Sequence, residues 1–282
     1  LAGSGDVTVS GTLNWTGGTM SGSGRTIIAA GATANLSGSS GKGLGRVFEN
    51  AGTANYSGTG LNLAPAFGVG GTLTNTPGGV FNVTGEGDFD ISYGGTAAAF
   101  NNAGSFTKSG AGTTTYFNIV FNNLSSGSVQ VQSGMLRFDA GGANSGGISV
   151  DAAATLWFNT SFTHTAGSLL SGVGTVTFTS GTHSFPAGTF TPTGTVNFSS
   201  GSTITINNAF TPAGLGTIGA TVTFNSAIDW TGAVTITGSA TFNAAQSFSS
   251  LTFSSGTLAG SGDVTVSGTL NWTGGTMSGS GR

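Results

Sequence analysis

Residues 11–18 read GTLNWTGG, a short alternating segment with small residues at both ends. In an extended chain Leu13 and Trp15 point to one face, whereas Thr12 and Asn14 point to the other. The flanking glycines favour tight turns because glycine adopts positive φ at little cost. The stretch therefore predicts a short β-strand that has one buried face and is bounded by turns.

Phrases of the same kind recur along the chain. They are GATANLSG from Gly31, AGTANYSG from Ala51, GGVFNVTG from Gly78, AATLWFNT from Ala153, GTVTFTSG from Gly174, GTVNFSSG from Gly194 and GATVTFNS from Gly219. Periods of about 20 to 50 residues are typical of solenoids and propellers, and a propeller blade needs about twice the length available here. The pattern predicts an all-β fold, a parallel β-helix (β-solenoid) with about 12 coils of roughly 21 residues. We expect the right-handed form, because the coil length varies along the chain.

The last apolar residue of each phrase is the candidate core. We expect these residues to stack in line along the solenoid, where coils about 4.8 Å apart would extend the twelve over roughly 58 Å. The candidates are Trp15, Leu36, Tyr56, Val83, Phe158, Phe178, Phe198, Phe224, Phe242 and Trp272. Each coil is too thin to fold alone, so stability is expected to come from stacked neighbours.

Residues 258–282 repeat residues 1–25 at all 25 positions. The offset predicts a tandem repeat of 257 residues, with residues 1–257 as one solenoid unit and residues 258–282 as the start of the next. Neither terminal stretch has the helix or polar coil that usually caps a solenoid, so we expect both ends to be cuts in a longer array. The sequence alone leaves open whether the second copy is a genomic repeat or an overlap.

Composition excludes several classes of protein. Charged residues make up 5% of the 282, against about 25% in an ordinary globular domain. The 20 phenylalanines argue against disorder, and six basic residues with a net charge of −3 argue against a nucleic-acid partner. No apolar run reaches the roughly 18 residues of a membrane helix. The chain has no cysteine, which excludes disulfides and thiolate metal sites.

Longer phrases resemble the repeat regions of large bacterial secreted surface proteins, the filamentous-haemagglutinin-like and autotransporter-passenger β-solenoids. The phrases are GTLNWTGGTMSGSG, GGVFNVTGEGDF, FNNAGSFTKSGAGTTT and SGSVQVQSGMLRFDAGG. The resemblance implies export, a secreted or cell-surface location and a role as a long stalk or fibre, and it transfers no catalytic residue. We therefore expect a structural protein, with no enzyme activity and no cofactor.

The expected partners are further copies of the same repeat, end to end and side by side. The main alternative is an adhesin stalk that presents a binding tip outside this segment. Minor alternatives are an ice-binding solenoid, suggested by the pairs Thr175 with Thr177, Thr203 with Thr205 and Thr221 with Thr223, and a polysaccharide-active solenoid.

Two groups of side chains are candidates for metal chemistry. Glu86, Asp88 and Asp90 alternate along GEGDFD, which would place three carboxylates on one side of an extended segment, an arrangement that suits Ca²⁺. A solvated loop is the alternative. His164 and His183 are 19 residues apart, about one coil, so they are predicted on neighbouring coils, either as a stacked or surface pair or sharing a metal.

The sequon Asn-x-Ser/Thr recurs and mostly falls at the outward position of the phrase. It predicts either a row of glycans on one face or an asparagine ladder favoured by strand geometry. The candidate glycosylation sites are Asn14, Asn35, Asn55, Asn82, Asn123, Asn159, Asn197 and Asn271.

Overall fold

The computed structural model describes residues 1–58, 60–62, 70–91 and 98–282. These residues form strands and turns without a helix, and the strands stack in parallel as a β-solenoid of about 13 turns. The prediction of a parallel β-helix is confirmed; its handedness stays a prediction. The chain divides into two compact units, Leu1–Ile148 and Ser149–Arg282. This division follows spatial contacts, so the 257-residue sequence unit also stays a prediction.

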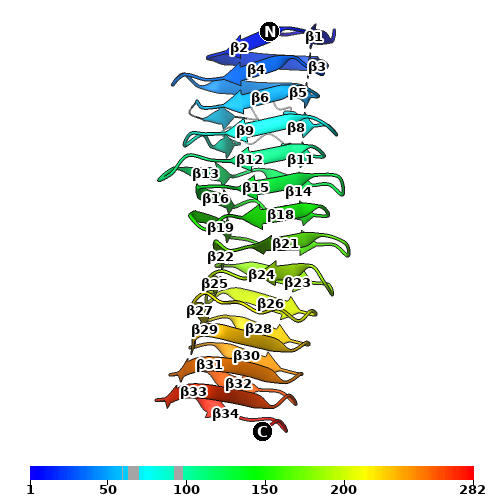
Figure 1. The fold of residues 1–282 in the computed structure, drawn as a ribbon. Coiled ribbons are helices and arrows are strands. Elements are labelled where there is room, and N and C mark those ends of the chain that lie inside the picture. The colour runs from blue at the N-terminus through cyan, green and yellow to red at the C-terminus, as the bar shows by residue number, and fades with distance from the viewer. Residues whose placement is uncertain (59, 63–69, 92–97) are drawn as a thin grey trace. The chain divides into compact units, whose positions relative to one another are not determined.

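In the first unit each complete coil contributes one strand to each of three parallel stacks (Figure 1). The first stack consists of β2 (Thr12–Trp15), β4 (Thr33–Leu36), β6 (Thr53–Tyr56), β9 (Val80–Val83), β12 (Ser105–Lys108) and β15 (Ser128–Val131). The second consists of β1 (Val7–Val9), the later parts of β3 (Gly18–Ile28) and β5 (Lys42–Asn50), β8 (Thr72–Asn75), β11 (Ala99–Asn102), β14 (Val120–Asn123) and β17 (Gly142–Asn144). The third consists of the early parts of β3 and β5, then β7 (Leu61–Asn62), β10 (Phe89–Asp90), β13 (Thr114–Phe117) and β16 (Gly134–Phe138).

The second unit is built in the same way, and β18 (Gly147–Val150) spans the boundary between the units. One stack contains β19 (Ala154–Phe158), β22 (Thr175–Phe178), β25 (Val196–Phe198), β27 (Gly216–Ile218) and the later parts of β29 (Ile228–Ile236), β31 (Gln246–Phe253) and β33 (Val264–Trp272). Another contains β23 (Gly181–Phe185), β26 (Ser202–Ile206), β28 (Thr221–Phe224), β30 (Ser239–Phe242), β32 (Thr257–Ala259) and β34 (Thr276–Met277), with β20 (Phe162–His164) in contact with β23. The third contains β21 (Leu169–Gly172), β24 (Phe190–Pro192) and the early parts of β29, β31 and β33.

Alternation along the strands places apolar side chains inside the coils. Phe158, Phe178 and Phe198 are aligned in register, and their rings stack with centroids 5.1 and 5.6 Å apart. All three are fully buried. Aromatic rings therefore form a column along this part of the core, and the ring of Phe178 is covered by Phe158 on one side and by Phe198 on the other.

Nine of the ten candidate core residues are buried, as predicted, and Trp272 is the exception at 54% exposed. Trp272 pairs with Phe253 in β31, but no later strand of the described chain stacks on β33. The expected single line of anchors is also wrong. Trp15, Leu36, Tyr56 and Val83 share one column, whereas the column of Phe158 lies in another stack, and Phe224 and Phe242 share a further one. Each face of a coil carries the same alternating chemistry, so the phrase recurs on all three.

Candidate functional site

Four of the predicted glycosylation sites form an outward asparagine ladder in the first stack. The side-chain amides of Asn35, Asn55 and Asn82 each donate a hydrogen bond to the preceding asparagine, the first of these acceptors being Asn14, over 2.9 to 3.2 Å. The side chains are exposed or half-buried. The ladder interpretation is thus confirmed for these four positions, and glycosylation of the outward asparagines stays a prediction.

Asn123 is wrongly predicted as a glycosylation site. It is 1% exposed, and its Nδ2 donates to Asn144 Oδ1 and to the carbonyl of Gly147, which leaves no room for a glycan. It belongs to a second, buried ladder at the ends of successive strands, in which each Nδ2 donates to the next Oδ1 over 2.8 to 2.9 Å. The members are Asn50, Asn75, Asn102, Asn123 and Asn144.

This buried ladder is not among the features predicted from the sequence, although the sequence carries a signal for it. Each member ends its strand and is followed two to four residues later by a glycine that lies at the turn into the next strand, as Gly127 follows Asn123 and Gly146 follows Asn144. A Cβ on Gly127 would lie 2.3 Å from Asn123 Oδ1. Glycine is thus required beside the amide, and the ladder satisfies backbone carbonyls that the turn would otherwise bury unpaired.

The three carboxylates of the candidate calcium site do not converge on one point in the described part of the chain. The main-chain N–H of Tyr116 donates to Asp88 Oδ1, and Asn118 Nδ2 donates to Asp90 Oδ1, while Glu86 is exposed. Burial, together with repulsion from Asp90 and Glu86, raises the pKa of Asp88. Among the described residues no group of three or more His, Cys, Asp or Glu side chains is placed to hold a metal ion. Asp88 and Asp90 accept hydrogen bonds from protein donors instead.

A second titratable group near this segment is Lys108, which is fully buried where the phrase predicts an apolar residue. Its Nζ donates to the carbonyl of Ser109 and to Thr113 Oγ1, at 2.7 and 2.6 Å. Burial lowers the pKa of Lys108 to about 8. The long side chain reaches the edge of the coil and bonds a turn there, which is a structural role.

His164 in β20 and His183 in β23 lie side by side inside the second unit, with ring centroids 6.1 Å apart. They are 5% and 1% exposed, and the ring of Phe185 stacks on His164 at 4.0 Å. Burial is the main cause that lowers the pKa of His164 to about 3 and that of His183 to about 4. The neighbouring-coil prediction from their spacing is confirmed, and the pair is a neutral, stacked part of the core.

Hydroxyl side chains line the outer face of the stack from β23 to β34 in two columns. Thr203 pairs with Thr221 in register, and Thr205 pairs with Thr223. The columns continue to Thr182 and Ser184 on one side and to Ser239, Thr241, Thr257 and Thr276 on the other. Thr175 and Thr177 lie in a different stack, where Thr177 is flanked by Trp157 and Asn197, so they do not extend these columns.

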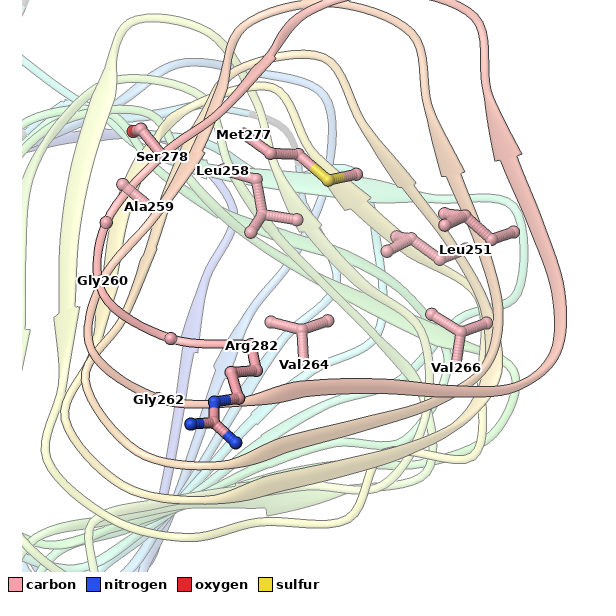
Figure 2. Close-up of a pocket in the computed structure, with 13 residues that line it drawn as sticks. Leu251, Leu258, Ala259, Gly260, Gly262, Val264, Val266, Met277, Ser278 and Arg282 are labelled. Atoms are coloured by element: carbon pink, nitrogen blue, oxygen red, sulfur yellow. The ribbon is translucent and has the colours of Figure 1, made fainter.

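The last coil encloses a cavity of about 250 Å³. Figure 2 shows Leu258, Val264, Val266 and Met277 directed into the space that the coil surrounds. Trp272 and Met277 are 54% and 37% exposed. The coil therefore presents an open apolar face made by residues 258–282, which are the residues of the sequence duplication.

The two copies of the duplicated segment share glycine conformations and main-chain hydrogen bonds at several positions in their respective units. Gly3 and Gly260 have φ of 119° and 121°, and Gly22 and Gly279 have 98° and 104°. The main-chain N–H of Ser21 donates to the carbonyl of Leu1 over 2.8 Å, and Ser278 donates to Leu258 over the same distance. A Cβ on Gly22 or Gly279 would lie 2.2 Å from the carbonyl oxygen of Gly3 or Gly260, so both copies need the same glycines.

The apolar face that is open in the second copy of the segment is buried in the first copy. Trp15 and Met20, the counterparts of Trp272 and Met277, are each 5% exposed. Trp15 is paired with Leu36, and its ring lies 6.4 Å from that of Phe48. Met20 is paired with Leu44. Residues 26–50 thus form the coil that buries this face.

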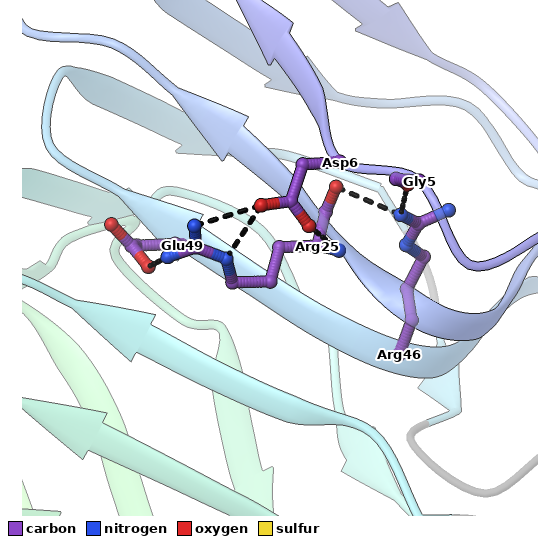
Figure 3. Close-up of polar contacts among 5 residues, drawn as sticks. All are labelled: Gly5, Asp6, Arg25, Arg46 and Glu49. Carbon is purple, nitrogen blue, oxygen red and sulfur yellow. Dashed lines mark hydrogen bonds and ion pairs between the residues drawn. The ribbon is translucent and has the colours of Figure 1, made fainter.

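A small polar network holds that covering coil in register (Figure 3). Arg25 bonds Asp6 at 2.8 Å and Glu49 at 3.1 Å, and this exposed pairing lowers the pKa of Asp6. The buried Arg46 donates from Nη2 to the carbonyls of Gly5 and Arg25, each at 2.8 Å. Arg46 therefore ties residues 26–50 to the backbone of residues 1–25.

No protein-family model, curated protein or solved structure shows significant similarity to the chain. Among the described residues no helix has the length and apolar character needed to cross a membrane.

Proposed function

We propose that the chain is a structural β-solenoid protein whose 257-residue unit repeats in tandem to build a fibre, stalk or sheath at the bacterial cell surface. The observation that carries the proposal is the set of glycine conformations and main-chain hydrogen bonds that residues 1–25 and 258–282 share. In the first copy, residues 26–50 follow Arg25 directly and form the next coil. Arg282 is the counterpart of Arg25, so the same coil could follow it.

Hydrogen bonding at the end of the copy supports this continuation. The main-chain N–H of Arg282 donates to Asp263 Oδ1 over 2.9 Å, as that of Arg25 donates to Asp6 Oδ1 over 2.7 Å. A following segment with the sequence of residues 26–50 would therefore find the same partners. It would also cover Trp272 and Met277, as Leu36 and Leu44 cover Trp15 and Met20.

The sequence resemblance and the composition favour the surface role. The resembled proteins are secreted bacterial β-solenoids, and 5% charged residues leave little self-repulsion to oppose close packing of rods. A rod stabilised by stacked coils suits a structural role, since its length grows with each added unit.

The experiment compares the chain with a two-unit protein, residues 1–282 extended by a second copy of residues 26–282. Cryo-electron microscopy should show a straight rod longer by about 58 Å, twelve coils at about 4.8 Å each. Gly279→Ala at the junction should kink or break the rod, because the added Cβ meets the carbonyl oxygen of Gly260, whereas Gly11→Ala has open space and should leave it straight. Two separate short rods in the unaltered two-unit protein would contradict the proposal. Immunogold labelling of intact source cells tests the surface location, and label confined to the cytoplasm would count against it.

A second candidate function, ice binding, is favoured by the two hydroxyl columns between β23 and β34. Ice binding predicts thermal hysteresis that is lost in Thr221→Lys, in the column, and kept in Thr175→Lys, outside it. A solution without thermal hysteresis, or equal activity in both variants, would reject this function.

A further inference from the structure

We propose that His164 and His183 bind a soft monovalent cation, of the class of Cu(I) and Ag(I), between their rings inside the second unit. The inference goes beyond the proposed structural function, because it gives the interior of the coil a ligand of its own. The two residues are the only histidines in the chain. Without the ion, their rings form the neutral pair described above.

The ring nitrogens of the pair are the observation from which the inference starts. Nδ1 and Nε2 of His164 and Nδ1 of His183 are buried without a hydrogen-bond partner, whereas buried polar atoms are normally paired. His183 Nε2 lies 3.1 Å from the carbonyl oxygen of Ser180, and since a carbonyl only accepts, this nitrogen carries the proton and Nδ1 keeps its lone pair. Burial also lowers the pKa of both rings, so both stay neutral at neutral pH. Each ring therefore offers a lone pair that no protein group uses.

The distance between the two rings fits an ion held by one nitrogen from each. Two metal–nitrogen bonds of about 2.0 Å, and about 1.1 Å from each nitrogen to its ring centre, give centroids about 6 Å apart in a linear arrangement. The centroids of His164 and His183 are 6.1 Å apart, and the rings are inclined by 40°. Because χ2 of histidine is a broad torsion, small ring rotations can direct a nitrogen of each side chain at a common point.

The surroundings of the pair select the kind of ion. Zn²⁺ takes four ligands, but in the described part of the chain no third His, Cys, Asp or Glu joins the two histidines. No carboxylate bonds to either ring, so a double positive charge would be buried without compensation. Cu(I) and Ag(I) carry a single charge, accept imidazole and need only two ligands in a line.

Phenylalanine rings add a further attraction for a cation at this place. The ring of Phe158 lies 5.6 Å from each imidazole, while Phe185 lies 4.0 Å from His164 and Phe178 lies 4.8 Å from His183. Aromatic faces attract a cation within about 6 Å, and they do so more strongly away from water. The four aromatic coils around the pair thus favour a single, weakly hydrated charge.

The test uses Ag(I), added as silver nitrate in chloride-free buffer while the full chain refolds from urea. Loading during refolding suits a site inside the coil, because metal binding couples to folding. After free silver is removed, native mass spectrometry should show one silver ion per wild-type chain. His164→Phe and His183→Phe each keep an aromatic ring and should lower the retained silver at least tenfold.

The matched control is Met135→Leu, which removes a soft sulfur ligand from the first unit and should keep one silver ion. A wild-type chain that retains no silver would overturn the proposal, as would equal retention by the variant that lacks both histidines. If a histidine variant does not fold, X-ray absorption of the silver-loaded wild-type chain decides. Two nitrogen neighbours at about 2 Å from the silver would support the site, whereas sulfur neighbours would refute it.

Discussion

Mild acid should destabilise the second unit through His164 and His183, above the pH at which carboxylates titrate. Burial lowers the pKa of His164 to about 3 and of His183 to about 4, from the ordinary 6.5. The unfolded chain takes up a proton on each ring near pH 6.5, whereas the folded rings stay neutral. Between these values the unfolded state binds more protons, so stability is full above pH 6.5 and falls as the pH is lowered.

The size of the effect follows from the two rings. One differential proton changes the free energy of unfolding by about 1.4 kcal/mol per pH unit, so two rings give about 2.7 kcal/mol per unit. This slope should be reached below about pH 6, once both rings are charged in the unfolded state. Because a domain is stable by about 5 to 15 kcal/mol, a drop from pH 6 to pH 5 removes roughly a fifth to a half of that stability.

Urea unfolding at pH 7.5, 6.0, 5.5 and 5.0, followed by tryptophan fluorescence, measures the slope directly. His164→Phe and His183→Phe keep an aromatic ring among the neighbouring phenylalanines and should each remove about half of the slope, and the double variant should remove all of it. The comparison uses the change with pH, so a constant packing cost in a variant does not affect it. Equal slopes in the wild-type chain and the double variant would refute the assignment of acid sensitivity to the buried pair.

Three further variants test the core, the buried ladder and the buried arginine. Phe178→Ala should lower the free energy of unfolding by about 3 to 5 kcal/mol in urea titrations, because its ring is enclosed by the aromatic column, whereas Leu215→Ala at 64% exposure should cost little. Asn102→Ala should cost about 2 to 4 kcal/mol, because it removes the donor to the buried Oδ1 of Asn123 and to the carbonyl of Ser128, whereas Asn101→Ala on the outer face should cost less than about 0.5 kcal/mol; equal losses would contradict the ladder's role. Arg46→Met should stay within about 1 kcal/mol of the wild-type chain in urea titrations, since an apolar side chain relieves a buried charge; loss of several kcal/mol would instead make Arg46 a stabilising residue.

The alternation of Leu13 and Trp15 was enough to predict a strand between turns, and the recurrence of this phrase along the chain was enough to predict the solenoid. Apolar side chains at every second position have one way to be buried in so thin a coil, and glycine marks the corners. The assignment of each phrase to a face could not be predicted, because strands on all three faces follow the same rule. Trp272 shows a second limit: burial in a solenoid depends on the next coil, and the local sequence of Trp272 is the same as that of Trp15.

The polar interior was less predictable than the apolar one. Asn123 is the first residue of a sequon, as Asn82 is. However, Asn123 ends its strand and its side chain is buried, where its amide donates hydrogen bonds to Asn144 and to the carbonyl of Gly147. Lys108 occupies a position at which the repeated phrase predicts an apolar residue. Its burial is explained by the nearby turn, because its Nζ donates a hydrogen bond to Thr113 Oγ1. In both cases the deciding partner lies at a corner of a coil, where sequence periodicity carries no information.

The register of one coil on the next is difficult to specify in a uniform solenoid. The few charged residues near the duplicated segment specify it there. Leu36 and Leu44 could pack on almost any coil, because every coil offers an apolar interior of similar width. Arg46 could not pack on another coil in this way. Its Nε and Nη1 already lack hydrogen-bond partners, so the loss of the carbonyls of Gly5 and Arg25 would leave a buried guanidinium without any hydrogen bond. An unpaired buried charge costs several kcal/mol, enough to reject a slipped coil. The apolar columns thus supply cohesion at every coil, and a single arginine restricts residues 26–50 to one surface, the face made by the 25 duplicated residues.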